Sequence, residues 1–124
     1  MATEMPERVR LLLDRHISSV EQLELLFLLH EDASASFTPE TAAKRIGTTG
    51  HSARIRLAEL VAGGLARESD GAYVYAAGTH DTAVADLRRL YSTHRVRIIS
   101  RIFDKPPESV RNFADAFRLK KKDQ

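Results

Sequence analysis

Apolar residues recur at helical spacing along most of the chain, and this spacing predicts a mainly helical protein. In residues 6–15, Val9, Leu12 and Leu13 mark one face of a first helix. The segment that follows, residues 18–33, is apolar almost all round its predicted helix. Such a helix is buried on several sides, so we expect it to be the core helix of the domain or part of a dimer face.

Two shorter helices are predicted in the middle of the chain, on either side of the sequence "GTTG". The first covers residues 39–46, with Thr38 as its N-cap and Gly47 at its C-terminal end. The second covers residues 50–62, with Thr49 as its N-cap. Its predicted buried face consists of Ala53, Leu57, Leu60 and Val61.

A β-hairpin is predicted after the second of these helices. Asp70-Gly71 stands between two short alternating runs, which is a strong signal for a tight hairpin turn. Tyr73 and Tyr75 fall on one face of the second strand. A short extended piece, the "SASF" before Thr38, is also expected.

The spacing then predicts one long helix from residue 80 to 103, capped by Thr79. Its apolar seam includes Val84, Leu87, Tyr91 and Ile98. A helix of this length spans about 36 Å at ~1.5 Å per residue, more than the chain's own core requires. We therefore expect two copies to pair along it as a homodimer; the alternative is a monomer in which the helix folds back on its own chain.

Pro106-Pro107 ends the long helix, and a final short helix with the sequence "ESVRNFADAFRL" follows. Phe113 and Phe117 lie on one face of it and form either core or a docking face for a partner. The basic tail begins at Arg118. The predicted organisation is an N-terminal helix (1–16), a central unit (17–78) and C-terminal helices with a basic tail (79–124).

Charge is distributed unevenly along the 124 residues, although the net charge is only +2. Residues 1–37 carry 3 basic and 7 acidic side chains, whereas residues 79–124 carry 11 basic and 6 acidic ones. The acidic N-terminal part and the basic C-terminal part suggest that one surface binds a polyanion. Alternatively, these charges only lie on solvent-exposed faces of helices. Cysteine is absent, which excludes a disulfide framework, a thiolate metal site and a cysteine nucleophile.

The "GTTG" sequence raises the question of a phosphate-binding loop. A nucleotide P-loop requires a strand before the glycines and a Lys with Ser or Thr after them. Here a helix precedes the glycines and no Lys follows Gly50. Two helices joined by a short turn that contains Gly are instead typical of a helix-turn-helix, and a hairpin after them makes a winged helix.

Residues 36–78 resemble the winged helix-turn-helix of bacterial transcription regulators of the MarR, ArsR and GntR kind. The shared features are the pair Ala42-Ala43, Ile46-Gly47 at the turn, Leu57 and Leu60 in the second helix, and "GGLA" before the wing. The resemblance implies a winged helix with a long C-terminal helix and a final short helix. It also implies a homodimer that binds double-stranded DNA and represses transcription, with helix 50–62 in the major groove.

Several polar residues are candidate DNA contacts. Arg54 is the best candidate for a base contact, because a guanidinium pairs with guanine through two hydrogen bonds. The full set of candidates is Lys44, Arg45, Thr48, Thr49, His51, Ser52, Arg54, Arg56 and Arg67. Arg54 and Arg56 have an alternative role, in ion pairs with Glu40 or Glu59.

An adaptor that binds another protein is the alternative function. The acidic wing residues Glu68 and Asp70, and Ile55 at an outward position, favour it. We expect no enzyme activity, metal site or cofactor, because the five histidines have no ligand spacing and no catalytic motif is present. No apolar run is long enough to span a membrane, and we expect a cytoplasmic protein. An effector, if there is one, would bind between the winged helix and the long helix.

Overall fold

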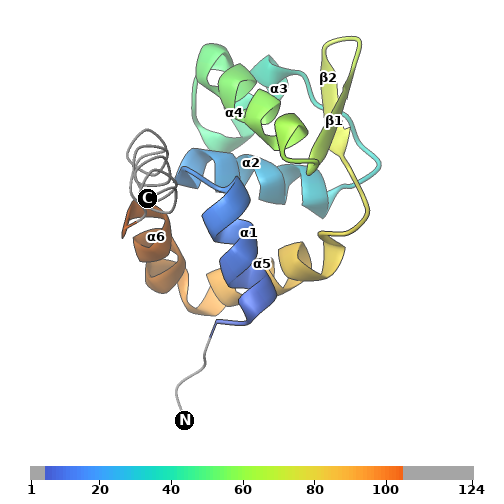
Figure 1. Cartoon of the computed structure of the whole chain (residues 1–124). Helices are drawn as coiled ribbons and strands as arrows, with labels where there is room; N and C mark the ends of the chain where they lie inside the picture. The colour runs from blue at the N-terminus through green and yellow to red at the C-terminus, as the bar shows by residue number, and fades with distance from the viewer. Residues whose placement is uncertain (1–4, 105–124) are drawn as a thin grey trace, which may run out of the picture.

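The computed structural model describes residues 5–104, which form six α-helices and one two-stranded antiparallel hairpin (Figure 1). This architecture is mainly helical and is compatible with a winged-helix-like fold. The elements are α1 (Glu7–His16), α2 (Val20–Glu31), α3 (Pro39–Ile46), α4 (Gly50–Ala62), β1 (Ala66–Ser69), β2 (Ala72–Tyr75), α5 (Asp81–Thr93) and α6 (Arg95–Asp104).

Helix α2 runs through the middle of the molecule. Figure 1 shows α3, α4 and the hairpin on one side of it, and α1, α5 and α6 on the other. Leu23, Leu25, Leu26 and Leu29 are completely buried along it. Each buried leucine contributes about 1.5–3 kcal/mol to folding, so the prediction that this apolar segment is a core helix is confirmed.

Three helices begin with a side-chain cap, and two of these caps are the predicted Thr38 and Thr49. The side chains of Ser19, Thr38 and Thr49 accept hydrogen bonds from backbone amides in the first turns of α2, α3 and α4, at 3.1, 3.2 and 3.1 Å. Each bond satisfies an amide that the helix itself leaves without a partner. The predicted cap at Thr79 is wrong: α5 begins after His80, which makes no side-chain cap.

The turn between α3 and α4 depends on one glycine. Gly47 has a φ of +82°, a conformation that costs other residues energy because of their Cβ. The amides of Gly47 and Thr48 both donate to the carbonyl oxygen of Ala43, at 2.8 and 2.9 Å. These bonds close α3, and α4 starts two residues later at a different angle.

The hairpin has the predicted turn. Asp70 and Gly71 have φ angles of 54° and 80°, as a two-residue turn with positive φ at both positions requires. Tyr73 and Tyr75 are buried on one face of β2. Phe37 forms an isolated bridge with Tyr73, through two hydrogen bonds of 2.8 Å, which confirms the short extended piece before α3.

The predicted long helix from residue 80 to 103 is wrong. Helix α5 ends at Thr93 and α6 starts at Arg95, with His94 between them at φ −131° and ψ 47°. The change of direction packs α6 against α1, where Arg101 donates two hydrogen bonds to the carboxylate of Asp14 at 3.0 and 2.6 Å. It also turns Ile98 into the core, where it is 1% exposed.

The expected dimer seam is therefore part of the chain's own core. Val84 and Leu87 are completely buried within one copy of the chain. The length of a single helix no longer supports a homodimer, which stays a prediction. The predicted final helix and the basic tail lie outside the described residues. Within residues 5–104, no helix is long and apolar enough to cross a membrane.

Candidate nucleic-acid interface

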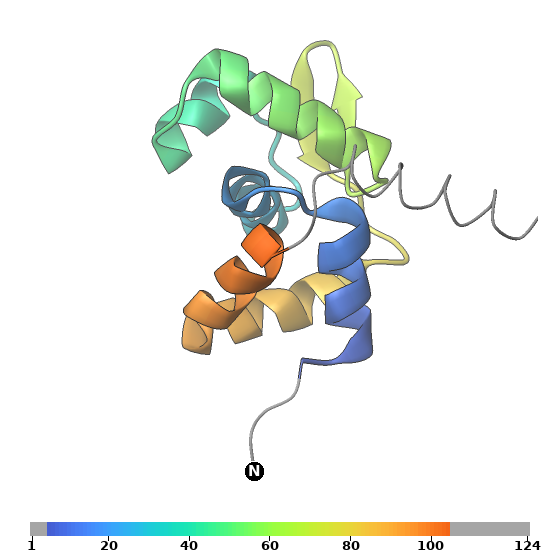
Figure 2. The same ribbon diagram turned by 60° about the vertical axis from the view of Figure 1, so that its left-hand side comes forward.

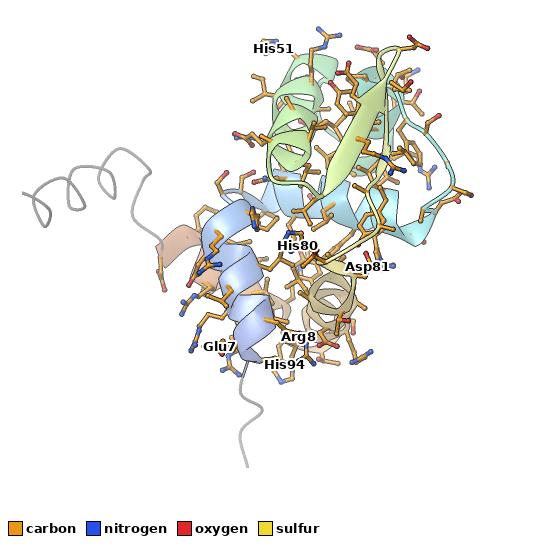
Figure 3. All side chains as sticks on the ribbon, turned by 45° about the vertical axis from the view of Figure 1, so that its right-hand side comes forward. Glu7, Arg8, His51, His80, Asp81 and His94 are labelled. Carbon is orange, nitrogen blue, oxygen red and sulfur yellow. The ribbon has the colours of Figure 1, made fainter. Side chains whose placement is uncertain are left out.

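The outward side of α4 is the first part of the candidate interface. Ala53, Leu57 and Leu60 are completely buried and attach α4 to the core. His51 and Arg54 are exposed on the remaining surface of the helix. Figure 3 shows His51 at the N-terminal end of α4, on the outside of the molecule. The N-terminal half of α4 is therefore accessible from outside the molecule.

Arg54 is exposed but already has an acidic neighbour. Its Nη2 lies 3.3 Å from Oε2 of Glu40 on α3, and both side chains are 62% exposed. The carboxylate of Glu40 also lies beside Gly50, where an added Cβ would be 3.1 Å from Oε2. An ion pair this exposed contributes little to stability, so a phosphate or a base can replace Glu40 as the partner of Arg54.

Ser52 and Arg56 have partners within the chain. The hydroxyl of Ser52 donates to the carboxylate of Glu21 at the start of α2. Nη1 of Arg56 donates to both carboxylate oxygens of Glu59, at 3.1 and 3.2 Å. Both side chains are half-buried. These two candidates are thus less accessible to DNA than the sequence alone indicated, and Arg56 has the alternative role expected for it.

The remaining candidates lie around α4. Lys44 and Arg45 are exposed at the C-terminal end of α3, where the guanidinium carbon of Arg45 is 6.0 Å from the ring centroid of Phe37. Thr48 and Thr49 form the turn, and the hydroxyl of Thr49 caps α4. Arg67 is exposed on β1, opposite Val74. The structure therefore brings the α3, turn and α4 candidates together, with Arg67 apart on the hairpin.

Acidic side chains are the feature that the sequence reasoning underestimated. Glu40 is one of the alternative ion-pair partners predicted for Arg54 and Arg56, whereas no pattern in the sequence indicates a contact of Glu21 with α4. Glu21 is 31 residues from Ser52 in sequence, and no local pattern predicts their contact. Two carboxylates thus stand beside the first turn of α4, where the helix dipole attracts negative charge.

A second polar cluster joins the hairpin to α2 and α5. The hydroxyl of Tyr75 donates to Oδ1 of Asp81 at 2.6 Å, and Nη1 of Arg88 lies 3.1 Å from Nδ1 of His30. Burial raises the pKa of Tyr75, and the hydrogen bond from Tyr75 lowers the pKa of Asp81. Burial, followed by the charge of Arg88, lowers the pKa of His30. We interpret this cluster as structural.

Neither metal ligation nor similarity to known proteins adds a further clue. Among residues 5–104, no group of three or more His, Asp or Glu side chains could hold a metal ion. No family model, curated protein or solved structure matches the chain. The geometry of α3, α4 and the hairpin is therefore the basis for a functional proposal.

Proposed function

We propose that this protein is a winged-helix regulator of transcription that binds double-stranded DNA with α4 in the major groove. The observation that carries the proposal is the position of Arg54. Its guanidinium is exposed on the outward side of α4, and within residues 5–104 its one ion-pair partner is the exposed carboxylate of Glu40. A guanidinium in this position suits recognition of guanine through two hydrogen bonds.

The neighbouring groups suit contacts with the DNA backbone. Lys44 and Arg45 on α3 would neutralise phosphates on one side of the groove, and Arg67 on the wing would do so on the flank. His51 at the end of α4 is exposed enough to meet a base edge or a phosphate. Phosphate contacts fix the position of the protein, and base contacts supply the sequence specificity.

The proposal includes a cytoplasmic homodimer that acts as a repressor. Its basis is the resemblance of residues 36–78 to the MarR, ArsR and GntR kind of regulator. A two-fold pair would place two α4 helices about one DNA turn apart, ~34 Å. In this mechanism the bound dimer blocks access of the transcription machinery to the DNA.

The experiment is a selection from a pool of genomic DNA fragments from the source organism, with sequencing of the retained fragments at two salt concentrations. Enrichment of a palindromic site that persists at the higher salt concentration supports the proposal. Retention that ignores sequence and disappears at the higher salt concentration contradicts it, because phosphate contacts alone behave in this way.

Two variants at one ion pair sharpen the test. Arg54→Glu should weaken binding to the selected site at least about tenfold, since a base contact contributes about 1–3 kcal/mol. Glu40→Gln should strengthen binding, because it removes a carboxylate that competes with DNA for Arg54. The matched control is Arg10→Glu, which makes the same charge change on α1 and should reduce binding far less.

A protein-binding adaptor is the second candidate function, favoured by one specific observation. Ile55 on the outward side of α4 is 45% exposed, whereas most large apolar side chains of residues 5–104 are buried. An apolar side chain at this position can contact a thymine methyl group or a protein partner. An adaptor should lose its partner in Ile55→Asp but not in the control Leu11→Asp on α1, and should show no selected DNA site.

A further inference from the structure

A small cavity lies between α1 and the beginning of α5, two helices that pack against each other (Figure 2). The cavity is open to the surface, and its volume is about 210 Å³. A cavity of about 150 Å³ holds a benzene molecule, and sites for drug-sized molecules span about 300–1,000 Å³. The volume therefore suits a molecule with a single ring or a short branched chain.

The floor of this cavity is apolar. Leu12 and Ala83 form part of it and are buried, and Leu11 stands at its edge. Leu11 is 37% exposed, whereas most large apolar side chains of residues 5–104 are buried. A ligand with an apolar body would remove the side chain of Leu11 from water, which favours binding.

The rim of the cavity carries basic side chains. Arg8 and Arg15 lie on the same face of α1, two turns apart. His16 of α1 and His80, the residue before α5, meet edge to face with their ring centroids 5.0 Å apart. Figure 3 shows Arg8 and His80 on the same side of α1. Among the described residues that line the cavity, none is acidic.

Arg15 is the side chain best placed to hold an anion. The carboxylate of Asp86 accepts hydrogen bonds from both Arg8 and Arg89, at 2.6 and 3.1 Å, so it neutralises only one of these two charges. Arg15 is exposed and takes part in no ion pair within residues 5–104. Its guanidinium can therefore turn to a ligand without breaking a contact of the fold.

Asp81 is the second carboxylate near the cavity, because it directly follows His80. It accepts hydrogen bonds from the hydroxyl of Tyr75 and the amide of Gly78, at 2.6 and 3.0 Å. With both histidines neutral, the three arginines and these two carboxylates leave a charge of +1 around the cavity. A ligand with one negative charge balances it.

The remaining carboxylates of α1 do not change this balance. Glu7 pairs with Arg10 at 3.5 Å, and Asp14 pairs with Arg101 at 2.6 Å. Neither of these two arginines lines the cavity. Each carboxylate is thus matched by a positive charge of its own.

We propose that this cavity binds a small carboxylate with a compact apolar body. The guanidinium of Arg15 holds the carboxylate, through two hydrogen bonds of the kind that arginine forms with carboxylates. The hydroxyls of Thr79 and Thr82, which also line the cavity, are further donors. The apolar body lies on Leu11, Leu12 and Ala83. The inference is independent of the proposed function, because it requires no contact with DNA.

Two other kinds of occupant are poorer. A helix from a second copy or a partner protein is about 10 Å wide, too large for a cavity of this volume. A phosphate group carries up to two negative charges, more than the single positive charge around the cavity balances. Both alternatives become outcomes of the experiment.

The experiment is an NMR titration of the isotope-labelled full chain with cyclohexanecarboxylate at pH 7.5. We expect saturable shifts of the backbone amides of Leu12, Arg15 and Thr82, with a dissociation constant of about 1 mM or below. The amides of His51 on α4 and Asp70 in the hairpin should not shift. Shifts that do not saturate by about 10 mM, or that spread over the whole surface, overturn the proposal.

Two further compounds test the chemical class of the ligand. Cyclohexanecarboxamide has the same shape without the charge, and should bind at least about tenfold more weakly. Equal binding of the amide overturns the proposal, because the cavity would then select only apolar molecules. Inorganic phosphate at the same concentration should not displace the carboxylate, and displacement would overturn the proposal in favour of a phosphate ligand.

A pair of matched variants tests the residue that holds the charge. Arg15→Gln should weaken binding of cyclohexanecarboxylate at least about tenfold, because it removes the guanidinium that pairs with the carboxylate. Arg10→Gln makes the same change at an exposed arginine of α1 outside the cavity, and should change the dissociation constant less than about twofold. Equal losses in both variants overturn the proposal, because they indicate only a general attraction of anions. Circular dichroism confirms that both variants keep their helices.

Discussion

Two pairs of consecutive helices are joined by short breaks, and the two breaks have different origins. Between α3 and α4 the chain turns at Gly47, with a φ of +82° and two amides bonded to the carbonyl of Ala43. Between α5 and α6 it turns at His94, with a φ of −131°, which any residue adopts. The first break is encoded by a glycine, and the second has neither a glycine nor a proline.

The difference shows that local sequence determines the first break and that tertiary contacts determine the second. At Gly47 the local sequence is sufficient, because a residue that tolerates positive φ stands where a helix must end. At His94 the local sequence permits a continuous helix, and contacts between distant segments end it. Ile98 and Ile102 enter the core, and Arg101 reaches Asp14 on α1. The following predictions test this contrast, from the largest expected effect to the smallest.

Removal of the core contact that follows the second break should have the largest effect. Ile98→Ala should lower the free energy of unfolding by about 2–5 kcal/mol, because Ile98 is 1% exposed and its loss leaves a cavity. The matched control Val96→Ala, at a residue that is 77% exposed, should change it by less than about 0.5 kcal/mol. Urea unfolding measures both, and equal losses would mean that Ile98 is no more buried than Val96, which contradicts the packing that follows the break.

Replacement of Gly47 at the first break by a residue with a Cβ should have the next largest effect on stability. Gly47→Ala should cost about 1–2 kcal/mol, because an L-residue at this φ is strained. Nothing lies within 4 Å of the added Cβ, so the cost is purely conformational. His94→Ala should cost less than about 0.5 kcal/mol, since its backbone needs no special residue. A larger loss from His94→Ala than from Gly47→Ala, again in urea, would reverse the contrast.

Two threonines that look alike in sequence should differ when substituted. Thr49→Ala should cost about 1 kcal/mol, because the hydroxyl caps α4 at 3.1 Å from the amide of Ser52. Thr79→Ala should change the free energy of unfolding by less than about 0.5 kcal/mol, because α5 has no side-chain cap at its N-cap, His80. Thermal unfolding of both variants provides the measurement. A comparable loss from Thr79→Ala would show that it caps α5 after all.

The smallest effect should come from pH, through the contact between α2 and α5. The pKa of His30 is lowered in the folded protein, whereas an unfolded histidine titrates near 6.5. Below pH 6.5 the unfolded chain therefore binds a proton that the folded chain does not, and stability falls as pH falls. Above pH 6.5 His30 is neutral in both the folded and the unfolded chain, and this loss of stability is absent.

The measurement is the midpoint of thermal unfolding at pH 7 and at pH 5. His30→Gln should reduce the difference between the two midpoints, because glutamine does not titrate and still offers Arg88 an acceptor. The control His51→Gln, at an exposed histidine, should leave the difference unchanged. An unchanged difference in His30→Gln would assign the pH dependence to other groups.

Much of the fold could be predicted because its signals are local. Thr38, Thr49 and Gly47 mark helix ends, and Asp70-Gly71 marks the hairpin turn. The candidate interface was predictable only as a set of residue types at helical positions. The ion pair of Arg54 with Glu40 was predicted only as one of several alternatives, and the contact of Ser52 with Glu21, 31 positions away, was not predicted. Such contacts follow from the packing of helices, which spacing along the chain does not encode.

The sequence by itself determined the helices around α2, the turn at Gly47 and the hairpin, because caps, glycines and apolar spacing act within a few residues. The tertiary structure alone decided that α5 and α6 are separate and that Glu40, rather than Glu59, is the ion-pair partner of Arg54. It also left Val96 and Phe103 exposed while burying Ile98. The physical reason is that burial of apolar surface belongs to the whole molecule: it ends a helix without a local signal when the new direction buries more of that surface.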